Sequence, residues 1–211
     1  MPETVLLPTG AATASHVERG SRFIATADRC ASFEQGLQLR DAERRHTHDA
    51  THHVWAIKLA DGNSRCDDDG EPAGTGGRPV LKEIETAGVV DAICLVTRYF
   101  GGTKLGTGGL ARAYGRAAAL ALEDMPTRRV RRAEIRYVVY RFEDTGIVAR
   151  VTASHGAVRD GDEFSDSVRT RIRIPVGTGE RLAKALVDST GGRAWLEPAI
   201  APEAAWIASE A

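Results

Sequence analysis

A short acidic and glycine-rich stretch, CDDDGEPAGTGGRP at residues 66–79, holds the residue types of several kinds of site. Its carboxylates at Asp68, Asp69 and Glu71 could bind magnesium or act as an acid/base pair. An EF-hand calcium loop requires glycine at its sixth position and glutamate at its twelfth, where this stretch has proline and arginine when counted from its first aspartate. A Walker sequence for nucleotide phosphates is also missing. The spacing therefore favours a solvated turn, with a magnesium or acid/base site as the alternative.

A second glycine-rich stretch, RYFGGTKLGTGGLARAY at residues 98–114, leads from a predicted strand into a predicted helix. The first N–H groups of a helix have no intrahelical acceptor, and glycine lets an anion approach them closely. We expect a ligand site in which the acidic loop faces this glycine loop. Its expected residues are Asp68, Asp69, Glu71, Arg98, Gly101, Gly102, Lys104, Gly106, Gly108 and Arg112. Residues 106–111 match GxGxxA, but residues 100–105 separate them from the strand, which argues against a dinucleotide-binding unit.

Arginine alternates with apolar residues along the predicted strand at residues 167–176. The period of two places these arginines on the sheet face away from the core. If Ile135, Tyr137 and Val139 of the neighbouring strand face the core, Arg136 and Tyr140 of that strand lie on the same open face as these arginines. Cations that neutralise phosphates, beside a ring that stacks on bases, suit nucleic acid, although such a face can also be solvated or dock on the other domain. The expected nucleic-acid-binding residues are Arg136, Tyr140, Arg169, Arg171 and Arg173.

Histidines at 46, 48, 52 and 53 raise the question of a metal. His48 and His52 could share one if their segment were helical, but the segment is expected to pass from helix into strand and no nearby cysteine completes a set. A serine triad is not expected either, because the GxSxG sequence is missing. We therefore predict no metal and no cofactor, identify no catalytic residue, and favour binding over catalysis.

The composition is that of a globular protein, with 42% hydrophobic and 27% charged residues in 211. No apolar run approaches the ~20 residues that span a bilayer, and the first residues do not resemble a secretory signal. Cys30, Cys66 and Cys94 lie far apart without a CxxC pair, which argues against disulfides or a cysteine zinc site. We expect a cytoplasmic protein with reduced thiols.

The charge distribution indicates two domains. Residues 1–126 carry 14 Lys and Arg against 17 Asp and Glu, a net of −3, whereas residues 127–195 carry 14 against 9, a net of +5. At 125–132 a proline ends an alanine-rich helix and four arginines follow. We predict domains at 1–126 and 127–196 and a tail at 197–211.

Periodicity and turn residues predict the elements of each domain. In the first we expect strand, strand, helix, strand, loop, helix, strand and helix, with strands at 21–27, 53–59 and 92–100 and helices at 32–45, 78–86 and 105–124. In the second we expect strands at 134–142, 158–164, 167–175 and 193–196 and helices at 144–155 and 178–190. The order βαββαβ suggests a ferredoxin-like sandwich, so the fold class is α+β.

Four motifs together resemble the IMPACT family, specifically its bacterial YigZ branch. They are DDGEPAGTGGRP at 68–79, VTRYFGGTKLGTGGLARAY at 96–114, SRFI at 21–24 and ATHHVWA at 50–56. The resemblance covers residues 15–195. At position 76 many relatives have a small residue other than glycine. The glycine of this chain is therefore expected to make the loop looser. His53-Val-Trp55 stands where relatives often have Asn-Cys-Tyr, so thiol chemistry is not expected there.

The resemblance implies an N-terminal β-α-β fold like that of the second domain of a small-subunit ribosomal protein, domain IV of elongation factor G and the GHMP kinases. It implies a C-terminal domain like the last domain of elongation factor G, and eukaryotic relatives regulate translation. We therefore expect a translation-associated regulator that binds RNA or the ribosome. The alternatives are an enzyme or small-ligand protein that binds a phosphorylated ligand at the glycine-rich helix start, and a protein-protein regulator without nucleic acid.

Overall fold

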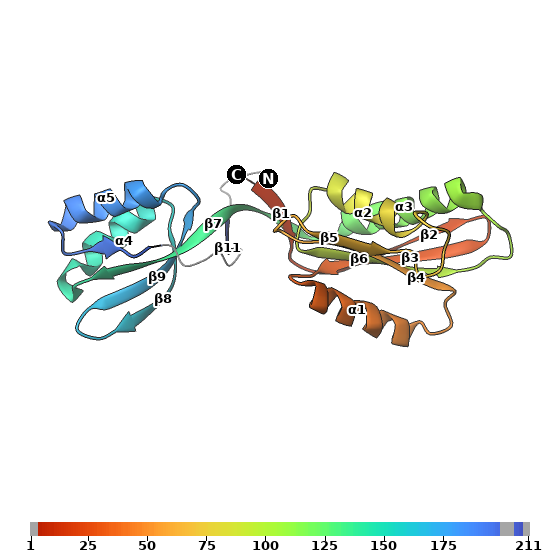
Figure 1. Ribbon diagram of the computed structural model, residues 1–211, viewed down its shortest axis with the longest axis horizontal. Coiled ribbons are helices and arrows are strands. Elements are labelled where there is room, and N and C mark those ends of the chain that lie inside the picture. Colours follow the sequence, from red (N-terminus) through yellow and green to blue (C-terminus); the bar gives the residue numbers. More distant parts are fainter. Residues whose placement is uncertain (1–3, 199–204, 209–211) are drawn as a thin grey trace. The chain divides into compact units, whose positions relative to one another are not determined.

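The computed structural model describes residues 4–198 and 205–208, which form two compact units that meet in sequence at Arg129 and Val130 (Figure 1). In the N-terminal unit, the sheet has the order β2-β3-β6-β4-β5, and all of its neighbouring strands are antiparallel. Its elements are β1 (Thr4–Pro8), β2 (Ala12–Glu18), β3 (Ser21–Arg29), α1 (Phe33–His46), β4 (His52–Lys58), β5 (Ser64–Asp67), α2 (Gly77–Thr86), β6 (Ala92–Tyr99) and α3 (Gly106–Asp124).

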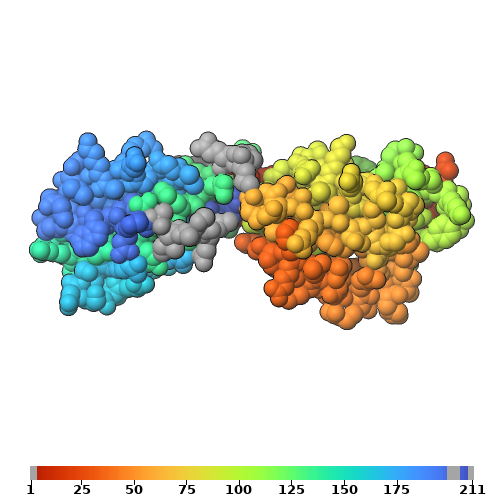
Figure 2. Space-filling model, in the orientation of Figure 1, coloured from red at the N-terminus to blue at the C-terminus, as the bar shows by residue number. Residues whose placement is uncertain are grey.

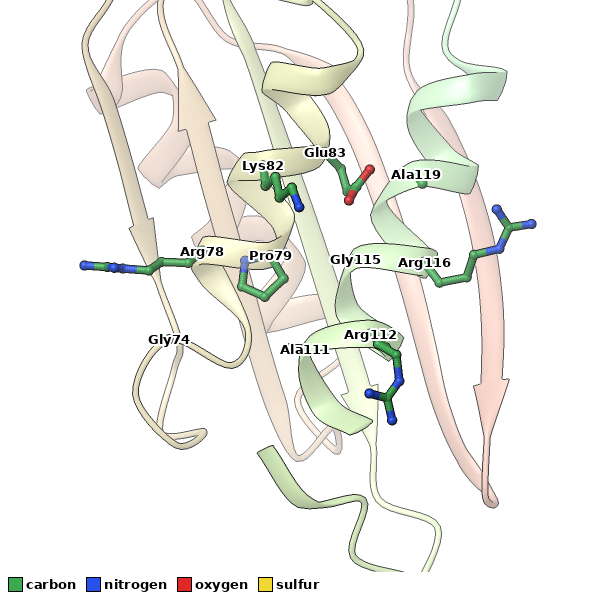
Figure 3. A pocket seen from close by; sticks show the side chains of 10 residues that line it. All are labelled: Gly74, Arg78, Pro79, Lys82, Glu83, Ala111, Arg112, Gly115, Arg116 and Ala119. Carbon is green, nitrogen blue, oxygen red and sulfur yellow. The ribbon is translucent and has the colours of Figure 1, made fainter. Parts of the chain in front are cut away.

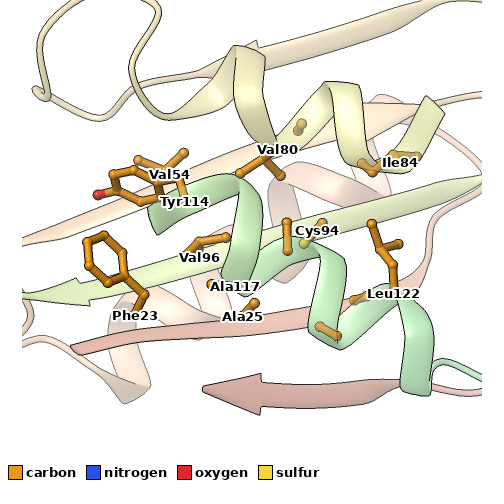
Figure 4. Packing of buried hydrophobic residues seen from close by; sticks show 14 of the residues in the cluster. Phe23, Ala25, Val54, Val80, Ile84, Cys94, Val96, Tyr114, Ala117 and Leu122 are labelled. Carbon is orange, nitrogen blue, oxygen red and sulfur yellow. The ribbon is translucent and has the colours of Figure 1, made fainter. Parts of the chain in front are cut away.

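The sheet of the N-terminal unit is covered on both faces, with α1 on one and α2 and α3 on the other (Figure 1). In this arrangement β6 is buried on both sides, and only Tyr99 at its end is partly exposed. Small residues of α3, such as Ala117 and Ala118, let the helix approach the sheet closely, and Tyr114 packs edge-on against Phe23 (Figure 4).

The C-terminal unit runs β7-α4-β8-β9-α5-β10, the order that the sequence predicts. Its antiparallel sheet has β10 and β9 on either side of β7 and β8 beyond β9, so the chain as a whole is a mixed α and β protein compatible with the α+β class. Its elements are β7 (Thr127–Tyr140), a 3-10 turn (Phe142–Asp144), α4 (Thr145–Ser154), β8 (Val158–Phe164), β9 (Val168–Pro175), α5 (Gly179–Thr190), β10 (Trp195–Leu196) and β11 (Ala205–Ala208).

The prediction of which β7 residues face the core is wrong by one residue. Val138 and Tyr140, not their neighbours, pack against Leu182 and Leu186 of α5 in the core. Tyr140 is fully buried and its hydroxyl pairs with Thr170 at 3.0 Å. A slip of one residue exchanges the two faces of a strand, so Tyr140 is not on the open face.

Arg136 also lies on the other face of β7 from the one that the sequence predicts. It lies opposite Ile172 of β9, on the helix side, and its Nε donates to the Glu197 carbonyl. Tyr137 instead shares the open face with the arginines of β9, since it lies opposite Arg171 and the Arg169 guanidinium is 3.7 Å from the centre of its ring.

The described residues form three strands more than the sequence predicts. Three strands, β1, β2 and β3, precede α1, where the sequence predicts two. Residues 64–67, expected in a loop, form β5 against β4, and Ala205–Ala208, within the expected tail, form β11 antiparallel to β7. The remainder of that tail, apart from residues 197–198, lies outside the described residues. A four-residue edge strand carries too little periodicity to be distinguished from a loop by sequence pattern.

We predict that Gly101→Ala destabilises the N-terminal unit. A Cβ at this position would lie 1.9 Å from the Gly20 carbonyl carbon and 2.2 Å from the Ser21 nitrogen, so the backbone must shift. The expected loss is about 1–3 kcal/mol in the free energy of unfolding, measured by urea denaturation. Gly115→Ala is the control, because its Cβ meets nothing closer than 3.6 Å and alanine favours a helix. Equal denaturation midpoints for the two variants would refute this account of the close contact.

Candidate functional site

Asp68 holds the acidic loop in shape. Its carboxylate accepts hydrogen bonds from the backbone N–H groups of Gly74, Gly76 and Gly77, at 2.7, 2.8 and 2.8 Å. Burial acts to raise the pKa of Asp68, but these three donors and the nearby charge of Arg78 outweigh it, so the pKa is lowered from 3.8. Because no side chain at the cap position itself serves the start of α2, Asp68 supplies acceptors for that helix end from outside.

Gly76 packs tightly within the acidic loop. A Cβ there would lie 2.8 Å from a methyl group of Val54, and the residue is buried. Its N–H is also held by Asp68. The expectation that glycine loosens the loop is contradicted by this packing.

Asp69 orients His52. The Asp69 side chain accepts from the His53 N–H at 2.7 Å and lies 3.3 Å from Arg44, while its carbonyl oxygen lies 2.8 Å from Nδ1 of His52. A carbonyl only accepts, so Nδ1 carries the hydrogen and the neutral ring presents an acceptor at Nε2. That nitrogen lies 3.8 Å from Oε1 of Glu71.

Glu71 and Arg98 form a buried ion pair. Their side chains are 4% and 6% exposed, and Nη1 of Arg98 donates to Oε1 of Glu71. The Tyr114 hydroxyl donates to the same oxygen at 2.8 Å, and burial together with this contact raises the pKa of Tyr114 well above its usual range. Nη2 of Arg98 donates to the Ser21 hydroxyl at 3.3 Å, which in turn accepts from the Gly101 N–H at 3.1 Å. One network thus joins the acidic loop, β6, α3 and the glycine loop.

A pocket of about 370 Å³ lies between the acidic loop and the glycine loop, and we call it the glycine-loop pocket. Its lining residues are Thr51, His52, Glu71, Pro72, Arg98, Phe100, Lys104, Leu105, Gly106, Thr107 and Leu110. The structure therefore brings Glu71, Arg98, Lys104 and Gly106 of the expected site together.

The other expected ligand residues do not line this pocket. Asp68 and Asp69 serve the loop itself, Gly101 packs on Gly20, and Gly102 adopts a left-handed φ of 86° in the glycine loop. Gly108 lies in the first turn of α3, and Arg112 lines a different groove. Sequence reasoning assigned no ligand role to His52, Phe100 or Tyr114, although each is part of the motifs at 50–56 and 96–114 that carry the family resemblance.

A larger groove of about 620 Å³ runs between α2 and α3. Four cations line it, with Glu83 as the one acidic lining residue among the described residues: they are Arg78, Lys82, Arg112 and Arg116. Figure 3 shows Lys82 over α2 and Glu83 between the two helices, with Arg78 and Arg116 pointing outward on either side. The side chains of these four cations form no ion pair or hydrogen bond with any residue of 4–198 or 205–208.

Charges along α2 and α3 oppose the helix dipoles. Neither helix has an acidic residue in its first turn or a basic residue in its last. The helices run in the same direction, because early α2 residues share the groove with Ala111 and Arg112, whereas late ones lie beside Leu122 and Glu123. Their positively polarised N-terminal ends therefore lie together, and the nearby cations add to that potential at a cost in stability. In Figure 2, α2 in yellow and the region of the glycine loop in yellow-green are exposed on one face of the N-terminal unit.

The arginines on the open face of the C-terminal sheet have carboxylate partners. Arg169 contacts Glu163 at 3.0 Å and Glu197 at 2.7 Å, and these acids raise its pKa. Arg173 contacts Asp160 at 2.7 Å and lies on the same face. Arg171 lies between them. The positive charge of this face is thus compensated within the unit.

Neither a metal site nor a membrane span is evident in the part of the chain that the structure describes. No group of three or more His, Cys, Asp or Glu residues there could hold a metal ion, and His53 instead contacts the Thr47 hydroxyl at 2.9 Å. No described helix is long and apolar enough to cross a bilayer. All three cysteines are unpaired, and burial raises the pKa of Cys94 to about 12.

Comparison with known proteins places the chain in a family. It is 40% identical over 179 residues to a Thermus thermophilus protein described as an IMPACT family member in pol 5'region, which covers 84% of this chain and 97% of that protein. The chain belongs to the IMPACT family. It is also similar to the IMPACT family member YigZ of Escherichia coli (strain K12), with 31% identity over 195 residues, 90% of this chain and 95% of that protein.

Residues 19–122 match the family described as Impact N-terminal domain, and this range contains both loops of the site. A solved structure, described as the crystal structure of an hypothetical protein, has a TM-score of 0.68 at 27% identity and covers 96% of this chain and 100% of that chain. The IMPACT resemblance inferred from the sequence motifs is thus confirmed, and the fold is shared along nearly the whole chain.

We predict that Asp68→Asn lowers stability in a pH-dependent manner. The asparagine keeps an acceptor for Gly76 and Gly77 but turns an N–H₂ toward the Gly74 N–H, so about 1.5–3 kcal/mol is lost at pH 7. Because the folded pKa of Asp68 is lowered, its contribution is present above the unfolded value near 3.8 and disappears as the pH falls through the folded pKa.

Urea denaturation of both proteins at pH 7 and pH 3 measures this difference. The gap between the wild type and Asp68→Asn should narrow at pH 3. Asp124→Asn, an exposed acid of the same unit, is the control and should have little effect at either pH. A gap that is the same at both pH values would contradict the role of the Asp68 charge.

Proposed function

We propose that the protein is a translation-associated RNA-binding protein whose RNA contact is the basic groove between α2 and α3. The observation that carries this proposal is the set of four groove cations, which form no ion pair within 4.0 Å with a described carboxylate, although the charge of Arg78 is near enough to help lower the pKa of Asp68. Free cations neutralise phosphates and release counterions, whereas cations already paired with carboxylates must first give up those partners. The groove therefore offers more to an RNA backbone than the open sheet face does.

The polarity of the two helices supports the same ligand. The start of α3 has no capping side chain, whereas the Gly76 and Gly77 N–H groups at the start of α2 already donate to Asp68, and Arg78 and Arg112 lie in the first turns of these helices or close to them. Cations at these ends disfavour folding by about 0.3–1 kcal/mol each, and a bound polyanion would reverse the sign of that interaction. A stretch of RNA phosphates supplies several negative charges along the groove, which a single small anion does not.

The association with translation rests on resemblance. The motifs imply domains like those of elongation factor G and a ribosomal protein, including a ferredoxin-like C-terminal unit, and this paired resemblance points toward the ribosome or structured RNA. Fold likeness alone supports only a class of partner, so the proposal extends to ribosomal or transfer RNA in the cytoplasm and not to a particular sequence.

Filter binding to ribosomal and transfer RNA at several salt concentrations tests the proposal. The groove variant Arg78→Gln/Lys82→Gln/Arg112→Gln/Arg116→Gln should flatten the slope of log affinity against log salt by about 3, since each lost phosphate contact contributes about 0.7–0.9. The matched control is Arg141→Gln/Arg150→Gln/Arg181→Gln/Lys184→Gln, which removes the same charge from exposed positions of the C-terminal unit. It should bind RNA nearly as well as the wild type.

A third variant separates the two basic surfaces. Arg169→Gln/Arg171→Gln/Arg173→Gln changes the open sheet face, where the sequence pattern places nucleic acid. If this variant loses binding and the groove variant does not, the RNA contact is on the sheet. If the wild type neither binds RNA near physiological salt nor co-sediments with ribosomes, the RNA function is wrong, and a protein-protein role would remain for nuclease-treated co-purification to test.

A further inference from the structure

The glycine-loop pocket contains two hydrogen-bond acceptors side by side. Oε1 of Glu71 already receives hydrogen bonds from Arg98 and Tyr114, whereas Oε2 receives none from the described residues. In the neutral form of His52, Nε2 is also an acceptor, because Nδ1 donates to the Asp69 carbonyl. Two neighbouring acceptors fit a ligand that presents N–H donors, such as the amino group of a nucleobase.

Another part of the same pocket favours an anion. Lys104 is exposed and its ammonium has no partner among residues 4–198 and 205–208, and Gly106 and Thr107 begin α3 without a capping side chain. The N–H groups of this helix end, together with Lys104, suit a phosphate. The same pocket is lined by Arg98, whose side chain is 6% exposed and whose Nε has no hydrogen-bond partner among the described residues.

The rest of the wall suits a flat ring. Pro72, Leu105 and Leu110 are apolar, and the Phe100 ring is 49% exposed. The backbone of Phe100 is held in place, since its N–H donates to the Thr51 hydroxyl at 3.1 Å. A volume of about 370 Å³ lies at the small end of the usual range for ligand pockets, which favours one nucleotide over a dinucleotide.

The buried ion pair between Glu71 and Arg98 positions a pocket residue. An apolar pair of similar volume is often as stable as a buried ion pair, so the pair of Glu71 and Arg98 is not required for packing. It does hold the Glu71 carboxylate, with Oε2 unpaired, in the pocket wall.

We propose that the glycine-loop pocket binds a nucleoside monophosphate whose base carries an amino group. The phosphate lies at Lys104 and the start of α3, the ring lies against Phe100, and the amino group donates to Glu71 and His52. This site is separate from the cations of the α2–α3 groove, so it does not depend on RNA binding there. The nucleotide is either free or the phosphorylated end of an RNA.

Isothermal titration of the full chain with AMP, GMP, CMP and UMP tests the proposal. AMP and CMP should bind about tenfold or more tightly than UMP, because uracil places a carbonyl oxygen against the two acceptors. GMP, whose C6 carries a carbonyl oxygen and whose amino group is at C2, should bind less tightly than AMP. Lys104→Gln should weaken AMP about tenfold and leave adenosine unchanged, since adenosine has no phosphate. Lys184→Gln, an exposed lysine of the C-terminal unit, is the control and should leave AMP binding unchanged.

Two further measurements complete the experiment. Glu71→Gln should remove the preference over UMP, and His52→Leu provides the same test without disturbing the buried ion pair should Glu71→Gln fail to fold. A 5′-phosphorylated RNA trinucleotide beside its 5′-hydroxyl form distinguishes an RNA end from a free nucleotide: the source is the RNA end if the phosphorylated trinucleotide binds more tightly than AMP.

Three results would each overturn the nucleotide site. The first is that none of the four nucleotides binds at concentrations up to about 1 mM, at which titration detects all but very weak ligands. The second is AMP binding that Lys104→Gln leaves unchanged, and the third is UMP binding as tight as that of AMP. None of these results bears on RNA binding by the groove, which the salt dependence measures separately.

Discussion

The buried ion pair between Glu71 and Arg98 is the interaction on which the N-terminal unit depends. It joins a loop, a central strand and, through Tyr114, a long helix that are far apart in sequence. Removing one partner of such a pair leaves an uncompensated buried charge and costs about 3–5 kcal/mol. The ion pair therefore ties the acidic loop to the strand that leads into the glycine loop.

This constraint determines what each surface of the unit can do. Because Glu71 is turned inward to Arg98, while Asp68 and Asp69 serve backbone groups, none of the three acids is available as an exposed metal ligand. Unlike these acids, Lys104 and the groove arginines form no ion pair with the described residues of the unit. They lie at the surface near the starts of α2 and α3. The outcome is a unit of acidic overall composition with a locally positive face, a difference that net charge conceals.

Much of the fold could be predicted from the sequence. The alanine-rich segment forms α3, Ser32 caps α1, and Gly191 ends α5 with a left-handed φ of 61°. Such local features can be predicted from the sequence because capping and periodicity act within a few residues. The faces of β7 were predicted wrongly because apolar residues occur on both of its sides, and only the packing of α4 and α5 selects Val138 and Tyr140 for the core.

The sequence by itself determined the family, the element order and the presence of a glycine-rich helix start near basic residues. It could not assign the acids, because Asp68, Asp69 and Glu71 are equivalent by composition and differ only in which donors surround them. Likewise, the sequence pattern shows the arginines of β9 but not the carboxylates of Glu163, Glu197 and Asp160 that pair with Arg169 and Arg173. Tertiary structure decided these points, since the charge that a ligand meets depends on partners far away in the chain.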